Sequence, residues 1–367
     1  MPRNLLIIVP SLRGGGAERV AMTLVRHIPR VEFKITLAIV DGRNAVYRND
    51  VPIDVEVIDF QSTRARFAVL KIWWLIWQRR PDVVFTTMGH LNLAVAALRP
   101  LLPRGTRHIA RETGNVVHAN QTRAWPRLWA WGCRHGYARI DAVVCQSAHM
   151  RDELINHFGV PAARLVVISN PVDIARIQQL VRLPLPASSV VRVMPDATQP
   201  PIQLVAAGSL LYVKGFDLLI DAVALCPNPK PHLTILGDGP LRAALAARAQ
   251  DQGVAAQVQF LGFQPNPYLL FAQADWFVLS SRADALPNVV LEALACGTPV
   301  VSTPAIGGIV ELLKRIPGCV VCDFTSTTSL AAALQRLTKS DRIPVEALAP
   351  YAVENIAAQY VRVLTDS

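Results

Sequence analysis

The chain has 367 residues, of which 51% are hydrophobic and 17% are charged, so it can form two hydrophobic cores and is neither disordered nor collagen-like. No stretch of 18 apolar residues runs uninterrupted, and the apolar run 5–9 is too short for the core of a signal peptide, so we expect a cytoplasmic protein that does not span the membrane. The net charge of +10 favours an anionic partner, and six scattered cysteines with one close pair, Cys319 and Cys322, predict neither a disulfide framework nor a zinc site.

A strand, a glycine-rich turn and a helix open the chain. Residues 5–9 are apolar and rich in β-forming types, Gly14 to Gly16 form the turn, and residues 17–27 have helical spacing. Five more apolar runs follow, mostly separated by helix-length segments: residues 33–40, 55–60, 83–86, 108–110 and 142–145. This alternation predicts a parallel sheet with helices on both faces, within a first domain of residues 1–180.

Prolines and small polar residues interrupt this pattern, and we predict a linker over residues 181–200. A second domain, residues 201–344, repeats the alternation, with strands expected at 202–207, 233–236, 258–261, 276–279, 300–301 and 320–321, and helices at 216–225, 241–250 and 288–295. The predicted fold is α/β, with two doubly wound, Rossmann-like domains that face each other across a cleft. Residues 345–367 are expected to be helical and to pack back across the domain boundary.

The segment 280–301 contains the strongest candidates for a binding site. It follows an apolar strand, has Pro287 at the start of a helix and has Gly297 at its end. The first turn of such a helix presents free N–H groups that suit a diphosphate. Asp284 precedes this turn and Glu292 lies eight residues further on, so one carboxylate would bind sugar hydroxyls and the other a ribose. The alternatives are a helix cap for Asp284 and a solvated helix residue for Glu292.

The spacing of Asp284 and Glu292 resembles the E-x7-E signature of retaining glycosyltransferases of family 4, with Asp in the first position. Other segments resemble motifs of this family in the same order: residues 11–19 its glycine-rich opening, 169–173 its interdomain signature, 208–215 its phosphate-binding loop, and 237–240 and 261–262 two later motifs. The resemblance covers nearly the whole chain. It implies a GT-B fold, a nucleotide-sugar donor held mainly by the second domain, and retaining transfer without a metal or other cofactor.

The resemblance also implies roles for individual residues. Glu292 would hold the ribose, Asp284 the donor sugar, Lys214 the diphosphate, and the amides of Gly15 and Gly16 would approach the phosphates from the first domain. The donor-side positions implied in addition are Ser209, Gly239, Leu286, Pro287, Asn288 and Val289. A lysine on a glycine loop suits a leaving diphosphate, and its alternative is an ordinary surface charge.

Two positions depart from the family pattern. Ser209 stands where the family commonly has an arginine, and Arg282 is a candidate substitute. Asp284 is one carbon shorter than the Glu of the signature, which suggests a different donor sugar.

The first domain contains the acceptor-side candidates. Family members commonly place a histidine near the sugar, and His90 and His118 are the candidates here. Arg111 and Glu112 stand at the end of a predicted strand that would face the cleft. We expect a catalytic role for His90 or Glu112, but a structural role is the alternative for each, and the sequence does not choose between them.

Positive charge and tryptophan are concentrated in the first half of the chain. Residues 1–175 hold 23 Lys and Arg against 13 Asp and Glu and six of the seven tryptophans, whereas residues 176–367 hold 14 residues of each charge. The basic segments 71–80 and 123–135, which carry these tryptophans, suit adsorption to anionic lipid at the inner face of the cytoplasmic membrane. A buried helix face is the alternative, and nucleic acid is not the expected partner because no nucleic-acid-binding module is present.

Together these features predict a retaining, metal-independent glycosyltransferase. It would move a hexose or N-acetylhexosamine from a nucleotide sugar, expected to be a UDP-sugar, to a lipid-linked saccharide or a cell-envelope glycan such as lipopolysaccharide. The alternatives are a nucleotide-sugar epimerase or hydrolase of the same architecture, and a sugar-nucleotide-binding subunit whose catalysis has decayed.

Overall fold

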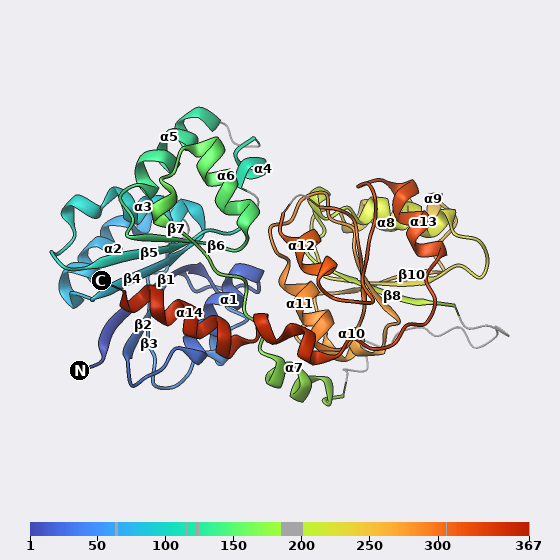
Figure 1. Cartoon of the computed structure of the whole chain (residues 1–367), viewed down its shortest axis with the longest axis horizontal. Helices are drawn as coiled ribbons and strands as arrows, with labels where there is room; N and C mark the ends of the chain where they lie inside the picture. The colour runs from blue at the N-terminus through green and yellow to red at the C-terminus, as the bar shows by residue number, and fades with distance from the viewer. Residues whose placement is uncertain (63–64, 115, 122–124, 185–200, 306, 367) are drawn as a thin grey trace. The chain divides into compact units, whose positions relative to one another are not determined.

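The computed structural model describes residues 1–62, 65–114, 116–121, 125–184, 201–305 and 307–366. The chain divides into two compact units, Met1–Pro171 with Tyr351–Ser367, and Val172–Pro350. Each is a parallel α/β unit, which confirms the predicted fold class (Figure 1). None of the helices in the described ranges is both long and apolar enough to cross a membrane.

The first unit has a parallel sheet in the order β3-β2-β1-β4-β5-β6-β7. Its strands are β1 (Arg3–Ser11), β2 (Phe33–Asp41), β3 (Glu56–Asp59), β4 (Val83–Thr87), β5 (Arg107–Arg111), β6 (Ala142–Cys145) and β7 (Leu165–Val167). In the centre of the sheet, Leu5 of β1 is in register with Ile35 of β2 and Val83 of β4. Its helices are α1 (Gly16–His27), α2 (Ala65–Arg79), α3 (Gly89–Ala97), α4 (Val116–Gln121), α5 (Pro126–Tyr137), α6 (Ala148–Phe158) and α14 (Val353–Thr365).

Both faces of this sheet are buried, because side chains alternate along each strand and helices cover both sides. In β1, Leu5 and Ile7 belong to the core on the side of α1 and α14, whereas Leu6 and Ile8 belong to the core on the side of α2 and α3. Continuous apolar strands of this kind are what the sequence shows at residues 5–9.

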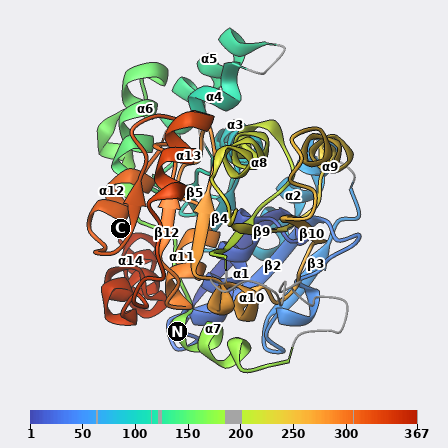
Figure 2. The same ribbon diagram turned by 90° about the vertical axis from the view of Figure 1, so that its right-hand side faces the viewer.

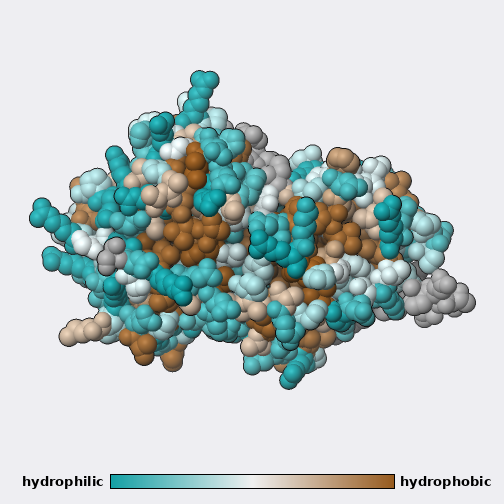
Figure 3. Space-filling view, in the orientation of Figure 1, coloured by the Kyte–Doolittle hydropathy of each residue, from teal (hydrophilic) through white to brown (hydrophobic). Residues whose placement is uncertain are grey.

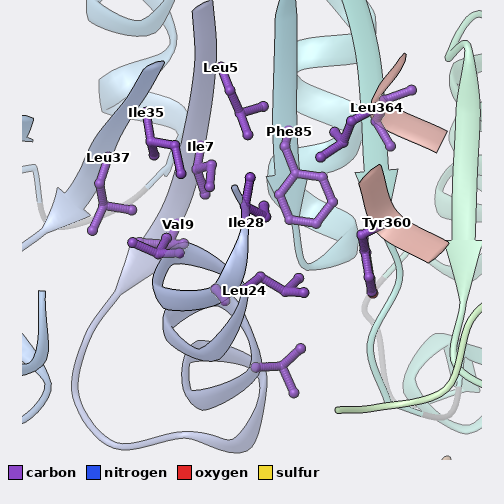
Figure 4. Packing of buried hydrophobic residues seen from close by; sticks show 14 of the residues in the cluster. Leu5, Ile7, Val9, Leu24, Ile28, Ile35, Leu37, Phe85, Tyr360 and Leu364 are labelled. Atoms are coloured by element: carbon purple, nitrogen blue, oxygen red, sulfur yellow. The ribbon is translucent and has the colours of Figure 1, made fainter. Parts of the chain in front are cut away.

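The last helix, α14, is part of the core of the first unit (Figure 4). Tyr360 packs edge-to-face on Phe85 of β4, with ring centroids 5.9 Å apart. The carbonyl groups at its carboxyl end are capped by two arginines from the sheet: Arg3 Nη1 donates to Thr365 O at 2.8 Å, and Arg107 Nη1 donates to Leu364 O at 3.3 Å.

The second unit has a parallel sheet in the order β10-β9-β8-β11-β12-β13. Its strands are β8 (Gln203–Ala207), β9 (His232–Leu236), β10 (Val258–Gly262), β11 (Trp276–Leu279), β12 (Val300–Ser302) and β13 (Val320–Val321). Its helices are α7 (Ile174–Val181), α8 (Phe216–Leu225), α9 (Arg242–Asp251), α10 (Tyr268–Gln273), α11 (Asn288–Ala295), α12 (Ile309–Lys314) and α13 (Thr327–Gln335). Helices α8, α9 and α13 cover one face of the sheet, and α7, α10 and α11 lie on the other (Figure 1, Figure 2).

The unit boundary lies after Pro171, whereas the sequence pattern placed the end of the first domain at residue 180. The reason is α7, which packs against α10 and α11 of the second unit and buries Ile177. Asn266 Nδ2 also donates to Leu180 O at 2.9 Å and ties the end of α7 to this unit. Most of the predicted linker, residues 185–200, lies outside the described residues.

Candidate functional site

In the second unit, the loops that follow β8, β9 and β11 lie at the carboxyl edge of the sheet, where open α/β folds bind ligands. The first two loops meet backbone to backbone, since a Cβ atom on Gly237 would lie 2.0 Å from Gly208 O. Leu210 N donates to Asp238 O at 2.9 Å and closes this contact. The glycine at position 237 therefore allows a loop packing that a larger residue would prevent.

Lys214 and Asp284, two residues that the sequence singled out separately, form an ion pair between their Nζ and Oδ2 atoms. Both side chains are partly buried. Ser280 Oγ donates to Lys214 O at 2.9 Å, so a side-chain to backbone hydrogen bond also joins the two loops. Gly215 follows Lys214 in the left-handed region, with φ of 65°. The ion pair places a cation and a carboxylate together just before the first turn of α11.

Helix α11 begins after Pro287, which makes no side-chain cap to the first-turn N–H groups. Leu286 and Pro287 are buried, whereas Asn288 and Val289 are partly exposed. Glu292 is buried within the helix. The pKa of the neighbouring Cys296 thiol is raised to about 12, chiefly by burial of the thiol and next by the negative charge of Glu292. Glu292 is therefore a buried carboxylate rather than a solvated helix residue.

Of the remaining donor-side candidates, Ser209 is exposed and Gly239 N donates to Asp238 Oδ1 at 2.8 Å. Arg282, the candidate substitute for the missing arginine, donates from Nη1 and Nη2 to the two carboxylate oxygens of Asp217 at 2.8 and 2.7 Å. Its guanidinium also lies 3.9 Å from the ring centroid of Tyr212. Burial raises the pKa of Asp217, but the hydrogen bonds and charge of Arg282 outweigh it and leave this pKa below its usual value. The charge of Arg282 is thus neutralised within the protein.

In the first unit, the glycine-rich turn encloses a carboxylate that sequence reasoning missed. Glu18, in the first turn of α1, accepts from Gly14 N at 3.0 Å and Gly15 N at 2.9 Å, and Ser11 Oγ donates to its other oxygen. The Gly15 amide, expected to approach phosphates, is therefore bound to Glu18 in this structure. The phosphate contact of Gly15 and Gly16 stays a prediction.

The acceptor-side candidates have different surroundings. His90, at the start of α3, is exposed, whereas Glu112 and Arg111, at the end of β5, are buried. Arg111 Nη2 donates to Asn170 Oδ1 at 2.5 Å, next to the unit boundary. Tyr137 OH donates to Glu112 Oε2, a contact that no sequence motif indicates. His118 lies on α4, and its side chain lies outside the described residues.

Metal ligands were not expected from the sequence. Within the ranges that the structure describes, no group of three or more His, Cys, Asp and Glu side chains is arranged to hold a metal ion.

The stability of the loop around Lys214 is expected to depend on Gly215. A Cβ atom there would lie 2.0 Å from Ser280 O, so Gly215→Ala adds a steric clash to the cost of a left-handed alanine and should lower the free energy of unfolding by roughly 3 kcal/mol. Gly253→Ala is the matched control, because Gly253 has φ of 67° but nothing within 4 Å of the added Cβ. Chemical unfolding of both variants measures the difference, and equal losses would contradict it.

Comparison with known proteins identifies the family. Residues 14–176 match the model described as Glycosyltransferase Family 4, and residues 195–354 match that of Glycosyl transferases group 1. The chain is 31% identical over 286 residues to the lipopolysaccharide core biosynthesis glycosyltransferase LpsE of Rhizobium meliloti, covering 73% of this chain and 79% of that protein. It is 24% identical to the N-acetylgalactosamine-N,N'-diacetylbacillosaminyl-diphospho-undecaprenol 4-alpha-N-acetylgalactosaminyltransferase of Campylobacter jejuni, over 93% of this chain and 92% of that protein.

Solved structures share the two-unit fold. Anabaena Alr3699/HepE in complex with UDP and glucose superimposes with a TM-score of 0.78 at 20% identity and full coverage of both chains. WaaG, a glycosyltransferase involved in lipopolysaccharide biosynthesis, superimposes with a TM-score of 0.69 at 17% identity, over 99% of this chain and 95% of that one. With this GT-B fold, both family models and the similarity to LpsE, the chain belongs to the glycosyltransferases.

Proposed function

We propose that this glycosyltransferase moves a hexose or N-acetylhexosamine from a UDP-sugar to a lipid-linked saccharide or cell-envelope glycan, with retention of configuration and without a bound metal. The observation that carries the proposal is the Lys214 and Asp284 ion pair ahead of α11. A leaving diphosphate needs cations and oriented N–H donors, and this edge of the second sheet supplies both. The relatives act in lipopolysaccharide core biosynthesis and in transfer to a diphospho-undecaprenol saccharide, and this supports the acceptor class.

In the mechanism that we propose, donor binding breaks this ion pair and gives each of its two residues a new partner on the donor. The diphosphate takes the place of Asp284 as the partner of Lys214, because it carries more negative charge and also binds the first-turn N–H groups of α11. Asp284 is thereby released and accepts hydrogen bonds from the donor sugar. Glu292 holds the ribose, so binding of the nucleotide and reading of the sugar are carried by different carboxylates.

A donor screen tests this function. Thermal unfolding is measured with UDP, GDP and ADP sugars, since a ligand that binds the folded state raises its apparent stability. Donor turnover is then followed with and without lipid-linked acceptor extracts. Acceptor-dependent release of UDP supports the transferase, acceptor-independent consumption of the donor supports a hydrolase or epimerase, and binding without turnover supports a decayed binding subunit.

Glu292→Gln is expected to weaken UDP binding about tenfold, the scale of one charged hydrogen bond. If the carboxylate holds the ribose, the wild-type protein should prefer UDP over 2′-deoxy-UDP or 3′-deoxy-UDP, and the variant should lose that preference. Calorimetric titration with the three nucleotides provides the measurement. A preference that survives in the variant would contradict the ribose contact.

We propose that the protein acts at an anionic membrane surface, because α2 exposes large apolar side chains. This helix is apolar on two faces: Ile72 and Ile76 are buried in the core, whereas Leu70 and Trp74 are 75% and 60% exposed. A helix that is apolar all round is ordinarily buried on all sides. The exposed cation Arg80 follows the helix, whereas Arg79 is paired with Glu56. Figure 3 shows hydrophobic side chains between hydrophilic ones on the surface of this unit.

Helix α5 and its N-cap residue add further exposed apolar side chains, namely Trp125, Leu128 and Trp131. Aromatic rings beside cations are the usual composition of an interfacial helix, and each cation near an anionic leaflet contributes roughly 1 kcal/mol. Trp73 and Trp77 of α2 differ from Trp74, because the indole Nε1 of each donates to Leu101 O, at 3.2 and 2.7 Å. The side chain of Trp73 is also only partly exposed.

The protein is accordingly expected to sediment with phosphatidylglycerol vesicles at low salt and to be released at high salt. Leu70→Ser combined with Trp74→Ser should abolish most of this binding. Ile53→Ser, which removes an exposed apolar side chain elsewhere in the first unit, is the matched control. Equal binding by both variants would exclude α2 as the membrane contact and favour a soluble acceptor.

A further inference from the structure

The turn between β4 and α3 carries exposed His90 and has an unusual backbone. Met88 has φ of 76° and ψ of 130°. Residues other than glycine rarely adopt this backbone conformation, which costs of order 1–3 kcal/mol. The surrounding structure must therefore hold the turn in place. Met88 N donates to Arg111 O at 3.2 Å, and Asn92 Nδ2 donates to the same carbonyl at 3.0 Å, so both ends of the turn are fixed to the end of β5.

The Glu112 carboxylate lies directly beneath the middle of this turn. A Cβ atom on Gly89 would lie 3.0 and 3.3 Å from its two oxygens, so the turn and the carboxylate are in close contact. Glu112 is only 4% exposed, Tyr137 OH donates to its Oε2 atom, and Thr113 N donates to its Oε1 atom at 2.9 Å. Gln146 Nε2 fixes the Glu112 carbonyl at 3.0 Å.

Tyr137, the donor of this contact, is fully buried in the last turn of α5. Burial and, next, the negative charge of Glu112 raise the pKa of its phenol well above the usual value, so the hydroxyl remains a donor at every physiological pH. A protonated tyrosine and a buried carboxylate thus form a fixed support below the turn.

We propose that Tyr137 and Glu112 are positioning residues, which hold the Met88 to His90 turn in its strained conformation and so present His90 to the substrate. This inference rests on the proposed transferase function and assigns different roles to two acceptor-side candidates. Glu112 has both oxygens engaged under the turn and acts through it, whereas His90 is exposed and contacts substrate.

The test combines kinetics with a structural readout. Tyr137→Phe removes one hydroxyl and keeps the ring, and it should lower kcat about tenfold, the effect of one lost charged hydrogen bond, while the donor KM and UDP affinity change less than twofold. In a His90→Ala background, Tyr137→Phe should cause no further loss, because its effect passes through His90. Tyr268→Phe is the control, since this tyrosine is also buried but packs against Phe271 in the second unit.

The readout that does not depend on activity is the NMR signal of the His90 ring, assigned by its absence in His90→Ala. Tyr137→Phe should shift or broaden this signal, and Tyr268→Phe should leave it unchanged. An unchanged His90 signal in Tyr137→Phe, or a kcat loss that is fully additive with His90→Ala, would overturn the proposal. If the wild-type protein itself transfers no sugar, the proposed function fails, and the His90 signal alone decides whether Tyr137 positions the turn.

Discussion

Replacing Lys214 with alanine is expected to lower kcat/KM for the donor by about 100-fold, which corresponds to the loss of a charged hydrogen bond to the diphosphate in a partly buried site. The loss should also appear in the affinity for free UDP, because the phosphates are common to the donor and to the product. Steady-state kinetics and calorimetric titration with UDP give the two values.

Two further variants separate this role from a general loss of charge. Lys314→Ala removes an exposed lysine from the last turn of α12 in the same unit and should leave both values unchanged. Lys214→Arg keeps the charge but changes its geometry, so it should recover part of the UDP affinity. Wild-type kinetics in purified Lys214→Ala would refute the assignment of this residue.

Asp284→Asn is expected to reduce sugar transfer by about 100-fold without weakening the binding of UDP. The asparagine cannot neutralise Lys214, so the ammonium group is already available to the phosphates and UDP affinity should be unchanged or higher. The sugar, in contrast, loses a charged hydrogen-bond acceptor.

The matched control is Asp221→Asn, which removes the partner of Arg248 in another ion pair of the second unit. Its transfer rate and UDP affinity should equal those of the wild-type protein. Equal losses of transfer and of UDP binding in Asp284→Asn would make Asp284 a nucleotide contact, and no loss in either would leave it as a partner of Lys214 alone.

The elements around the second-unit site were predictable because local chemistry specifies their ends. Pro287 and Gly297 flank α11, and its observed bounds, Asn288–Ala295, agree with the predicted ones. In contrast, β7 was not predicted, since three residues at the edge of a sheet give too short an apolar pattern. The boundary after Pro171 was also not predicted. The prolines of the predicted linker indicate where the backbone is irregular, but they do not indicate which unit α7 packs against.

The candidate site shows the same difference: its residues could be identified from local motifs, but the contacts between residues distant in the sequence could not. Lys214 and Asp284 were found from motifs, but their ion pair spans 70 residues of sequence and no motif encodes it. Tyr137 belongs to no motif at all, and only the packing of α5 brings its hydroxyl to Glu112. Glu18 carried a usable signal, because a Glu at the third position of a helix after a small residue is typical of a capping box.

The position of α14 has a consequence for biosynthesis. Arg3 and Leu364, which meet at the end of this helix, are 361 residues apart in the chain. The first unit therefore has the strands of its sheet long before its last helix, and its core stays open on one side until α14 has been made. During that interval the side chains later covered by Ile356 and Tyr360 are accessible to water, and the second unit, which is encoded as an insertion within the first, can fold before the first is complete.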